Sequence, residues 1–517
     1  MLATIDIIIV GLYALALFFL AQWVSRSSGT DKNASDYFLA GKSLPWWAIG
    51  ASLIAANISA EQIIGMSGSG YAIGLAIASY EWMAAITLIL VGKYLLPVFL
   101  RAEIYTMPQF LQQRYDHRVR LVMAFFWLGV YVLVNLTSVL WLGALAINTV
   151  AGVELNLALL LLGVFAAGYS LYGGLRAVAL TDIIQVVLLV LGGLLIAWIL
   201  LNEVSDGAGV LAGFGLLMDQ APEKFDMILS KDSPHYMSLP GLSVLIGGMW
   251  VMNVSYWGFN QYIIQRALAA KSIDEAQKGI AFAAFLKLLM PVIVVLPGIA
   301  VFVLGADISA PDQAYPHAMT LLPMGIKGLV FAALLAAIVS SLASMTNSIS
   351  TIFTMDIFPS FNKGEASVNP VRVGRIVALA AMLIAMIAAR PLLGNFDQAF
   401  QYIQEFTGFF TPGIVVIFIL GIFYAKTTAT AALTAAIASA VLSFAFSVLA
   451  PELPFIDRVG VVFLLCAALA VGISHLRPKP QAGAVELGDV SFTTSGSFNL
   501  SALLVTLILC AFYITWW

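Results

Sequence analysis

Residues 51–81 read ASLIAANISAEQIIGMSGSGYAIGLAIASYE, and the fold can be worked out from this stretch outward. It is apolar enough to lie in a membrane, yet it contains four polar residues and then four glycines: Asn57, Ser59, Glu61 and Gln62, followed by Gly65, Gly68, Gly70 and Gly74. Polar side chains and unwound backbone at membrane depth are tolerated only where protein buries them or where they line a wet cavity. We therefore predict that a glycine-rich break interrupts a helix here and that the segment lines a binding site.

Composition places the whole chain in a membrane. Of 517 residues, 61% are hydrophobic and 10% are charged, and the mean hydropathy is +0.98. This is outside the range of soluble domains and indicates a polytopic, all-α membrane protein. The net charge of −3 and the lack of a basic run argue against nucleic acid as a partner. Cys466 and Cys510 both lie in apolar runs and read as small core residues.

Fourteen apolar runs are long enough to span a bilayer, which takes about 20 residues each. They are 4–24, 46–70, 77–100, 120–148, 156–174, 180–202, 240–266, 279–304, 328–355, 371–389, 399–424, 428–449, 456–475 and 499–517. An even number places both termini on one side. The odd-numbered loops hold 17 Lys and Arg residues and the even-numbered loops hold 5. Because cytoplasmic loops are enriched in these residues, we expect both termini to be periplasmic or extracellular, in a bacterial inner membrane.

Two polar segments lie outside the membrane in this interpretation. Residues 203–239 form a long outer loop, and residues 478–498 form a cytoplasmic linker rich in Pro, Gly, Ser and Thr. Neither resembles an independent domain, so we expect residues 1–517 to form a single transmembrane domain.

Charged residues within spans are the first candidates for a binding site, because each is costly at the bilayer centre unless it is paired or hydrated. Glu81 and Lys287 form the leading pair. The alternative is a purely structural ion pair or snorkelling at a helix end. Polar residues on other helices favour a site, and they are Gln62, Asn253 and Gln404.

Such a set suits a small neutral polyol, because carboxylate oxygens accept from hydroxyls while ammonium and amide groups donate. Tyr256 lies three residues after Asn253 on the same helical face, so its ring could cover the apolar face of the ligand. Three neighbours could close over it: Met66, Tyr80 and Phe400. Each of these taken alone is more often lipid-facing or part of the core.

A second constellation suits a hard monovalent cation. Ala337, Ser340 and Ser341 share one helix face in ALLAAIVSSLASMTNS. Their oxygens could join backbone carbonyls of Ala55 and Ile58, since unwound carbonyls of discontinuous helices coordinate sodium in transporters with inverted repeats. Alternatively, the serines bond back to the preceding turn or support close packing. No HExxH, paired CxxC or GxSxG motif is present, so the residues of an enzyme are not visible, and the four histidines lack metal spacing.

Longer motifs resemble the sodium:solute symporter family, in particular its sugar-transporting branch. They are DYFLAGKSLPWWAIGASLIAANISAEQIIGMSGSGY, SLYGGLRAVALTDIIQV, YWGFNQYIIQRALAAKS, AAIVSSLASMTNS and AFQYIQEFTG. The resemblance implies a LeuT-like core of five plus five helices as an inverted repeat, with the second and seventh helices broken. The extra N-terminal helix would be 4–24, the two repeats 46–202 and 240–424, and the three extra C-terminal helices 425–517.

The resemblance also implies roles for single residues. The sugar ligands would be Gln62, Glu81, Asn253, Lys287 and Gln404, with Tyr256 stacking on the pyranose from the inner side and Met66, Tyr80 and Phe400 forming the outer gate. One sodium ion would be held by Ala55, Ile58, Ala337, Ser340 and Ser341, and Asp182 would mark the sodium exit route. Ala84 stands where the family's galactose symporters have a pocket serine, which leaves the preference between sugars open.

The predicted function is therefore sodium-coupled symport of galactose, glucose or both across the bilayer by alternating access. Other solutes such as inositol or sialic acid are alternatives, although an acid would favour a pocket arginine and no Arg lies mid-span. A sensor or channel without coupled transport is a further alternative. The chain can be a monomer or a homodimer.

Overall fold

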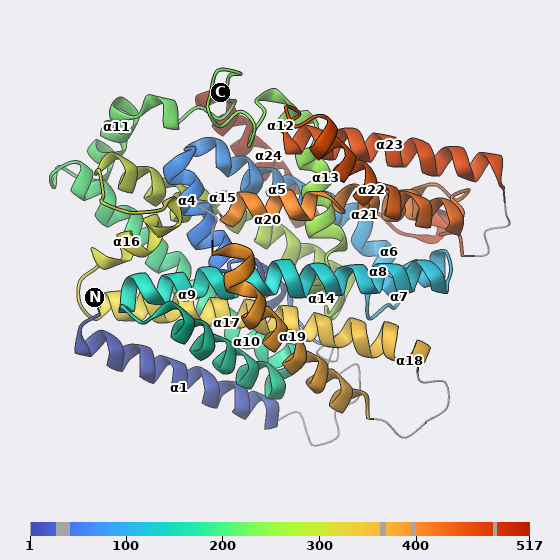
Figure 1. The fold of residues 1–517 in the computed structure, drawn as a ribbon, viewed down its shortest axis with the longest axis horizontal. Helices are drawn as coiled ribbons and strands as arrows, with labels where there is room; N and C mark the ends of the chain where they lie inside the picture. The colour runs from blue at the N-terminus through green and yellow to red at the C-terminus, as the bar shows by residue number, and fades with distance from the viewer. Residues whose placement is uncertain (1, 27–41, 362–368, 395–398, 479–482) are drawn as a thin grey trace.

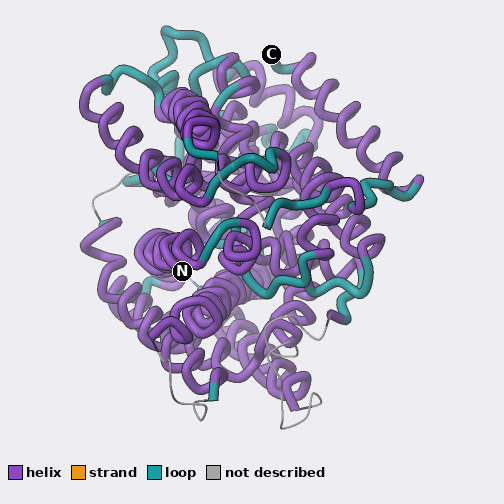
Figure 2. The backbone as a smooth tube through the Cα atoms, turned by 90° about the vertical axis from the view of Figure 1, so that its right-hand side faces the viewer, coloured by secondary structure: helices purple, strands orange, loops and turns teal. Residues whose placement is uncertain are grey.

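The computed structural model describes residues 2–26, 42–361, 369–394, 399–478 and 483–517, and these residues form helices joined by turns. The helices lie side by side along the long axis of the molecule (Figure 1). The N-terminus, α11 (Val210–Gln220) and α16 (Ala314–Thr320) are at the left end of that view, and α7 (Met107–Arg114) and α18 (Phe358–Phe361) are at the right end. Figure 2 shows several of the helices end-on within a single bundle. The predicted all-α architecture is confirmed.

The remaining helices follow in chain order. In the first half they are α1 (Thr4–Arg26), α3 (Trp46–Asn57), α4 (Met66–Ala72), α5 (Ser79–Leu90), α6 (Leu96–Arg101), α8 (His117–Val130), α9 (Thr137–Ala151) and α10 (Leu155–Val204). In the second half they are α12 (Leu242–Ile246), α13 (Gly248–Val254), α14 (Gln261–Leu268), α15 (Ile273–Val303), α17 (Ile326–Ile352), α19 (Pro370–Leu393), α20 (Ala399–Gly408), α21 (Thr411–Phe423), α22 (Ala429–Leu449), α23 (Phe455–Leu476) and α24 (Gly496–Thr515).

Short π-helical or 3-10 segments continue several of these helices. They are η2 (Glu61–Gly65), η3 (Leu75–Ala78), η4 (Val91–Leu95), η5 (Tyr131–Leu136), η6 (Pro222–Lys224), η7 (Ser255–Phe259), η8 (Pro311–Gln313), η9 (Phe353–Ile357) and η10 (Leu487–Asp489). Among the described residues, nine helices are long and apolar enough to span a membrane, or eleven when two bent pairs each count as one. The prediction of fourteen is therefore not fully matched. One reason is that the runs 156–174 and 180–202 belong to the single helix α10.

The break in the stretch 51–81 lies earlier than its glycines suggest. Helix α3 ends at Asn57, and the chain re-enters a helix at Glu61 with a bend of 64°. Gly65, Gly68 and Gly70 are helical, so the predicted glycine-rich break is wrong at these positions. Of the four glycines in this stretch, only Gly74 has a backbone conformation that favours glycine, with φ of 104°.

The glycines instead allow close packing of helix backbones. A Cβ atom at Gly70 would lie 2.7 Å from the carbonyl oxygen of Val295 on α15, and one at Gly298 would lie 2.1 Å from the carbonyl oxygen of Ser67. Both distances are shorter than van der Waals contact. Small residues let membrane helices approach in this way, so α4 lies directly against α15, the helix that carries Lys287.

Helix α15 is also anchored at its start. Ser272 is the N-cap, and its side chain accepts a hydrogen bond of 3.3 Å from the backbone N–H of Glu275. The Glu275 carboxylate in turn accepts from the backbone N–H of Trp46, the first residue of α3, at 2.6 Å. The two helices that flank the candidate site are thus joined at one end.

A second break lies in the seventh predicted span, residues 240–266, and confirms the expectation that this helix is broken. Asn260 has φ −79° and ψ 122°, so it separates η7 from α14 with extended backbone. Helices α20 and α21 form a further bent pair, with an angle of 48°.

Both ends of the described chain contact loops that follow even-numbered spans. The Asp6 carboxylate accepts from the backbone N–H groups of Gly325 and Gly328 at 2.7 and 2.9 Å. Near the C-terminus, the carbonyl oxygen of Trp516 accepts from the backbone N–H of Met227 at 2.9 Å. In the sequence interpretation both of these loops lie on the same side as the termini, and that orientation stays a prediction.

Asp6 gives a stability prediction, because its buried carboxylate holds the first turn of α17. Asp6→Ala leaves these N–H donors without their acceptor, and we expect the free energy of unfolding to fall by about 1–3 kcal/mol. Asp6→Asn keeps one acceptor oxygen, so its loss should be smaller. Thermal unfolding of the detergent-solubilised protein measures both. Equal stability of Asp6→Ala and wild type would contradict the prediction.

Candidate functional site

A small cavity of about 60 Å³ lies between the broken helices, α5 and α15. All nine residues predicted from the sequence as sugar ligands or gate line it: Gln62, Met66, Tyr80, Glu81, Asn253, Tyr256, Lys287, Phe400 and Gln404. They come from segments up to 342 positions apart in the chain, from Gln62 to Gln404. Ala84 also lines the cavity.

The centre of the cavity wall is a buried ion pair. Lys287 Nζ lies 2.6 Å from Glu81 Oε2, and their side chains are 1% and 4% exposed. Gln62 Nε2 donates to the other carboxylate oxygen of Glu81. The geometry therefore forms the predicted pair and adds a neutral donor from the broken helix. Their role as sugar ligands stays a prediction.

Asn57 also belongs to this hydrogen-bonded group, although the sequence interpretation gave it no individual role. Its Oδ1 accepts from Lys287 Nζ, and its Nδ2 donates to the Tyr256 hydroxyl at 3.0 Å. The indole of Trp257 lies under the lysine, with Nζ 4.9 Å from the ring centroid. The position of Asn57 as the last residue of α3, beside the break, was the available signal.

The amide of Asn253 is partly committed to its own helix. Its Nδ2 donates one hydrogen bond to the carbonyl oxygen of Met249 at 3.1 Å, which leaves Oδ1 and the second N–H of the amide with capacity for a ligand. Gln62 Nε2 also contacts the sulfur of Met66 at 3.3 Å.

Aromatic rings close the cavity on one side. Tyr80 and Phe400 meet edge to face, with centroids 5.3 Å apart, and both are buried. Phe400 lies so close to the broken helix that a Cβ atom at Gly65 would be 3.0 Å from its Cβ. Two of the three predicted gate residues are thus in contact, and Met66 lines the same cavity.

Tyr256 forms the boundary on the other side. It separates the first cavity from a second one of about 70 Å³, which shares Glu61, Met252, Tyr256 and Gln404 with it. The Tyr256 hydroxyl accepts from Asn57 and from the Tyr262 hydroxyl, each at 3.0 Å. Rotation of this ring would connect the two cavities.

The predicted sodium ligands are buried where α3 ends against α17. The Ser341 hydroxyl lies 3.4 Å from the carbonyl oxygens of Ala55 and Ala56. Past the end of α3, the backbone N–H of Ser59 donates to Asn57 at 2.7 Å. Hard oxygen donors from both helices therefore meet, which fits the chemistry of a sodium site. Ile58, Ala337 and Ser340 are buried here too, and their part in binding stays a prediction.

Two further residues from the sequence interpretation, Asp182 and Arg266, lie away from this cavity or outside the described side chains. The helix α10 includes Asp182, but that side chain lies outside the described residues. Arg266 is fully buried in α14, at the end of the predicted span 240–266, so the expectation that no arginine lies mid-span stays a prediction. It does not line the cavity; its guanidinium contacts Ser52, Tyr262 and Ser344.

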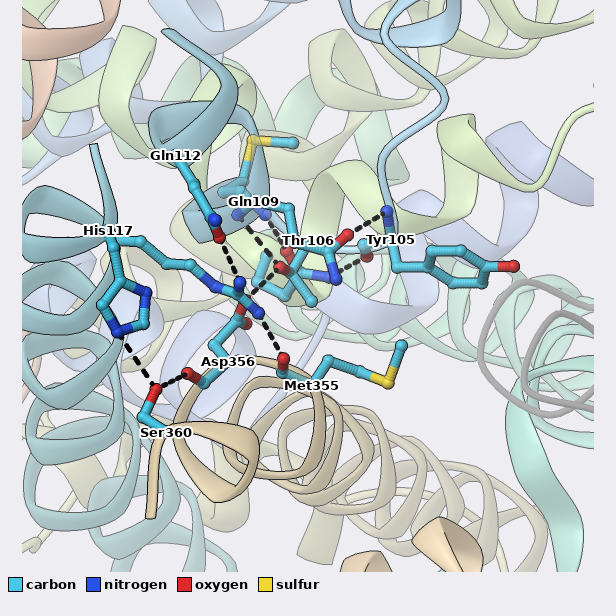
Figure 3. A network of polar contacts seen from close by, with 11 residues as sticks. Tyr105, Thr106, Gln109, Gln112, His117, Met355, Asp356 and Ser360 are labelled. Atoms are coloured by element: carbon cyan, nitrogen blue, oxygen red, sulfur yellow. Dashed lines mark hydrogen bonds and ion pairs between the residues drawn. The ribbon is translucent and has the colours of Figure 1, made fainter. Parts of the chain in front are cut away.

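A further polar network that the sequence did not reveal lies at the end of α17 (Figure 3). Arg120 Nε pairs with the buried Asp356 at 2.7 Å, and the Thr106 hydroxyl donates to the same carboxylate at 3.1 Å. Gln261, the first residue of α14, accepts from the N–H of Met107 at 2.8 Å and donates to the carbonyl of Tyr105 at 3.0 Å. The loop before α7 thus joins the break at Asn260 to α8 and α17.

These features define a membrane transporter in which two broken helices enclose a polar cavity at membrane depth. Comparison with known proteins agrees. Residues 37–439 match the sodium:solute symporter family. The chain is 49% identical to the sodium/glucose cotransporter of Vibrio parahaemolyticus, over 100% of this chain and 99% of the relative. It is 34% identical to the human sodium/myo-inositol cotransporter, over 87% and 68% of the two chains.

This chain belongs to the sodium:solute symporter family. Solved structures support the fold. One is a sodium-coupled sialic acid symporter in an outward-open state, with a TM-score of 0.80, 24% identity and coverage of 93% of this chain and 99% of that one. Another is Mhp1, a nucleobase-cation-symport-1 family transporter in a closed conformation, with a TM-score of 0.56, 15% identity and coverage of 91% and 99%. The LeuT-like fold is confirmed, and the chain is a transporter rather than an enzyme.

Proposed function

We propose that this protein couples the entry of sodium to the entry of a neutral monosaccharide, glucose or galactose, with sodium as the co-substrate. The observation that supports this most strongly is the buried Glu81–Lys287 pair in a cavity closed by Tyr80 and Phe400. The pair offers acceptors and donors to hydroxyls at no net charge. The Vibrio relative, named for glucose, supports the same substrate class.

The charged residues of the cavity disfavour an acidic substrate. Glu61, Glu81 and Lys287 line it, and no arginine is among the described lining residues. A carboxylate ligand would therefore meet two carboxylates and one ammonium that is already paired. A neutral polyol meets no such repulsion.

The proposed cycle uses the two sides of the cavity as gates. Sodium bound between α3 and α17 would hold the end of α3 in place and thereby fix Asn57, which contacts both Lys287 and Tyr256. Tyr80, Phe400 and Met66 would open to admit the sugar, and Tyr256 would move to release it. The contact between Tyr80 and Phe400 would then correspond to a closed outer gate.

We further propose that both termini face the periplasm or the exterior, because the opposite loops carry 17 of the 24 Lys and Arg residues. The gate formed by Tyr80 and Phe400 is then the outer one. The protein would act in the plasma membrane as a monomer or a homodimer.

Equilibrium binding tests the substrate class. Labelled glucose or galactose is bound to the protein in nanodiscs, in sodium or choline, and competed with the other sugar, with myo-inositol and with sialic acid. We expect sodium-dependent binding that the two hexoses displace. Absence of sodium-dependent binding of both hexoses would contradict the proposed substrate, and displacement of the labelled hexose by sialic acid would contradict a site restricted to neutral solutes.

Ala84 provides a prediction on sugar preference. It lines the cavity one turn after Glu81, and Ala84→Ser adds a hydroxyl there. One neutral hydrogen bond contributes about 0.5–1.5 kcal/mol, so we expect the affinity for galactose to rise roughly 2- to 12-fold. Competition binding with both hexoses measures the change. An unchanged or weaker affinity for both sugars would show that position 84 does not contact the ligand.

A further inference from the structure

We propose that Arg266 is the positioning residue that couples the sodium site to the sugar site. The inference rests on the proposed function and deepens it, because it identifies how occupancy of one site is transmitted to the other. Arg266 lies in α14, the helix that follows the break at Asn260, and it is 0% exposed.

The guanidinium holds both sodium-site helices. Its Nε donates to the Ser52 hydroxyl of α3 at 3.1 Å, one turn before Ala55. One terminal nitrogen donates to the Ser344 hydroxyl of α17. That hydroxyl donates to the carbonyl oxygen of Ser340 at 2.7 Å, so the contact reaches the turn that holds the predicted sodium ligands. The position of the Arg266 guanidinium therefore depends on the distance between α3 and α17.

Two hydrogen bonds, joined through the residue Tyr262, lead from the same guanidinium to Tyr256 at the sugar cavity. The other terminal nitrogen donates to the carbonyl oxygen of Tyr262. The hydroxyl of Tyr262 donates to that of Tyr256 at 3.0 Å, and Tyr256 accepts from Asn57. Tyr256 is the residue that divides the two cavities. A shift of α3 or α17 on sodium binding would thus move the floor of the sugar site through Arg266.

Arginine suits this position better than any other residue. It stays charged when buried, and its planar fork presents five donors in fixed directions, so it can hold three helix segments at once. The three partners named above are neutral oxygens on α3, α14 and α17. Lysine keeps the charge but has no fork, so Arg266→Lys tests the geometry rather than the charge.

The experiment measures coupling separately from affinity. Binding of labelled glucose or galactose to the full-length protein in nanodiscs is titrated without sodium and at saturating sodium, with choline keeping the ionic strength constant. The coupling ratio is the sugar Kd without sodium divided by the Kd with sodium. For wild type we expect a ratio of roughly 5 to 150, the usual range for linked sites. For Arg266→Lys we expect it to fall below about 3, while the sodium-free Kd changes by less than about threefold.

Arg114→Lys is the matched control. Arg114 is another buried arginine, and its guanidinium bonds the carbonyl oxygens of Gly421 and Ala425 around the end of α21, away from both sites. Its coupling ratio should equal that of wild type. A merely structural arginine would lower the amount of folded protein without changing the ratio.

The outcomes separate the two proposals. If wild type is coupled and Arg266→Lys keeps the full ratio, this inference is overturned and the proposed function stands. A wild-type ratio of one overturns both. If Arg266→Lys does not fold, Ser344→Ala decides, because it removes only the link to α17: a ratio reduced at least threefold supports the role of Arg266, and a wild-type ratio overturns it.

Discussion

Replacing Lys287 with alanine should abolish sugar accumulation and also destabilise the protein. The substitution leaves Glu81 buried without its partner, and breaking a buried pair in this way costs about 3–5 kcal/mol. Glu81→Ala should have the same two effects, because it leaves the Lys287 ammonium buried beside Asn57 and Trp257 without a carboxylate partner. Uptake of labelled sugar into proteoliposomes and thermal unfolding of the same preparations measure the two effects.

A neutralised pair separates stability from function. Glu81→Gln combined with Lys287→Met removes both charges, so we expect it to be more stable than either alanine variant yet unable to accumulate sugar. Buried ion pairs can often be replaced by uncharged side chains without loss of stability. Near-normal uptake by either alanine variant would remove the pair from the sugar site.

Replacing Ser341 with alanine should raise the sodium concentration needed for half-maximal uptake by roughly tenfold or more, because an oxygen bonded to a charged group typically contributes about 1.5–3 kcal/mol. Ser341 lies beside the carbonyls of Ala55 and Ala56. The maximal uptake at saturating sodium should change far less. Sodium titrations of initial uptake rates measure this.

Ser439→Ala is the control for that series, since Ser439 is an equally buried serine that bonds the carbonyl of Phe409 away from the site. Its sodium titration should match wild type. An unchanged titration for Ser341→Ala would mean that the hydroxyl is no sodium ligand and only supports the contact between α3 and α17.

Much of the fold could be predicted because hydropathy marks membrane helices and because burying a charge within such a helix costs free energy unless the charge is paired or hydrated. Glu81 and Lys287 stood out in apolar runs, and the structure pairs them. Gln404 and Phe400 were candidates because of their side chains, and the resemblance to the family then gave each of them a role, since no pattern of spacing can bridge their distance along the chain from the broken helix. All of these residues line one cavity.

What the sequence could not reveal depends on packing. Gly65, Gly68 and Gly70 suggested a break, yet they are helical. Glycine lacks a side chain, which can either let a helix break or let another segment pack closely against it, and here these glycines permit close packing. Arg266 lay at the end of an apolar run and resembled an ordinary interfacial charge. Only the meeting of α3, α14 and α17 shows that it is buried.

Uphill transport is the most direct test of sodium-coupled symport. Proteoliposomes are loaded with labelled glucose or galactose at the external concentration, and a tenfold inward sodium gradient with an internal potential of −100 mV is imposed. Together these supply about 3.7 kcal/mol per sodium, enough for an accumulation of several hundredfold at one sodium per sugar. We expect net accumulation that disappears when sodium is replaced by choline. Equilibration of sugar without accumulation, with or without sodium, would contradict coupled symport and indicate a passive pathway.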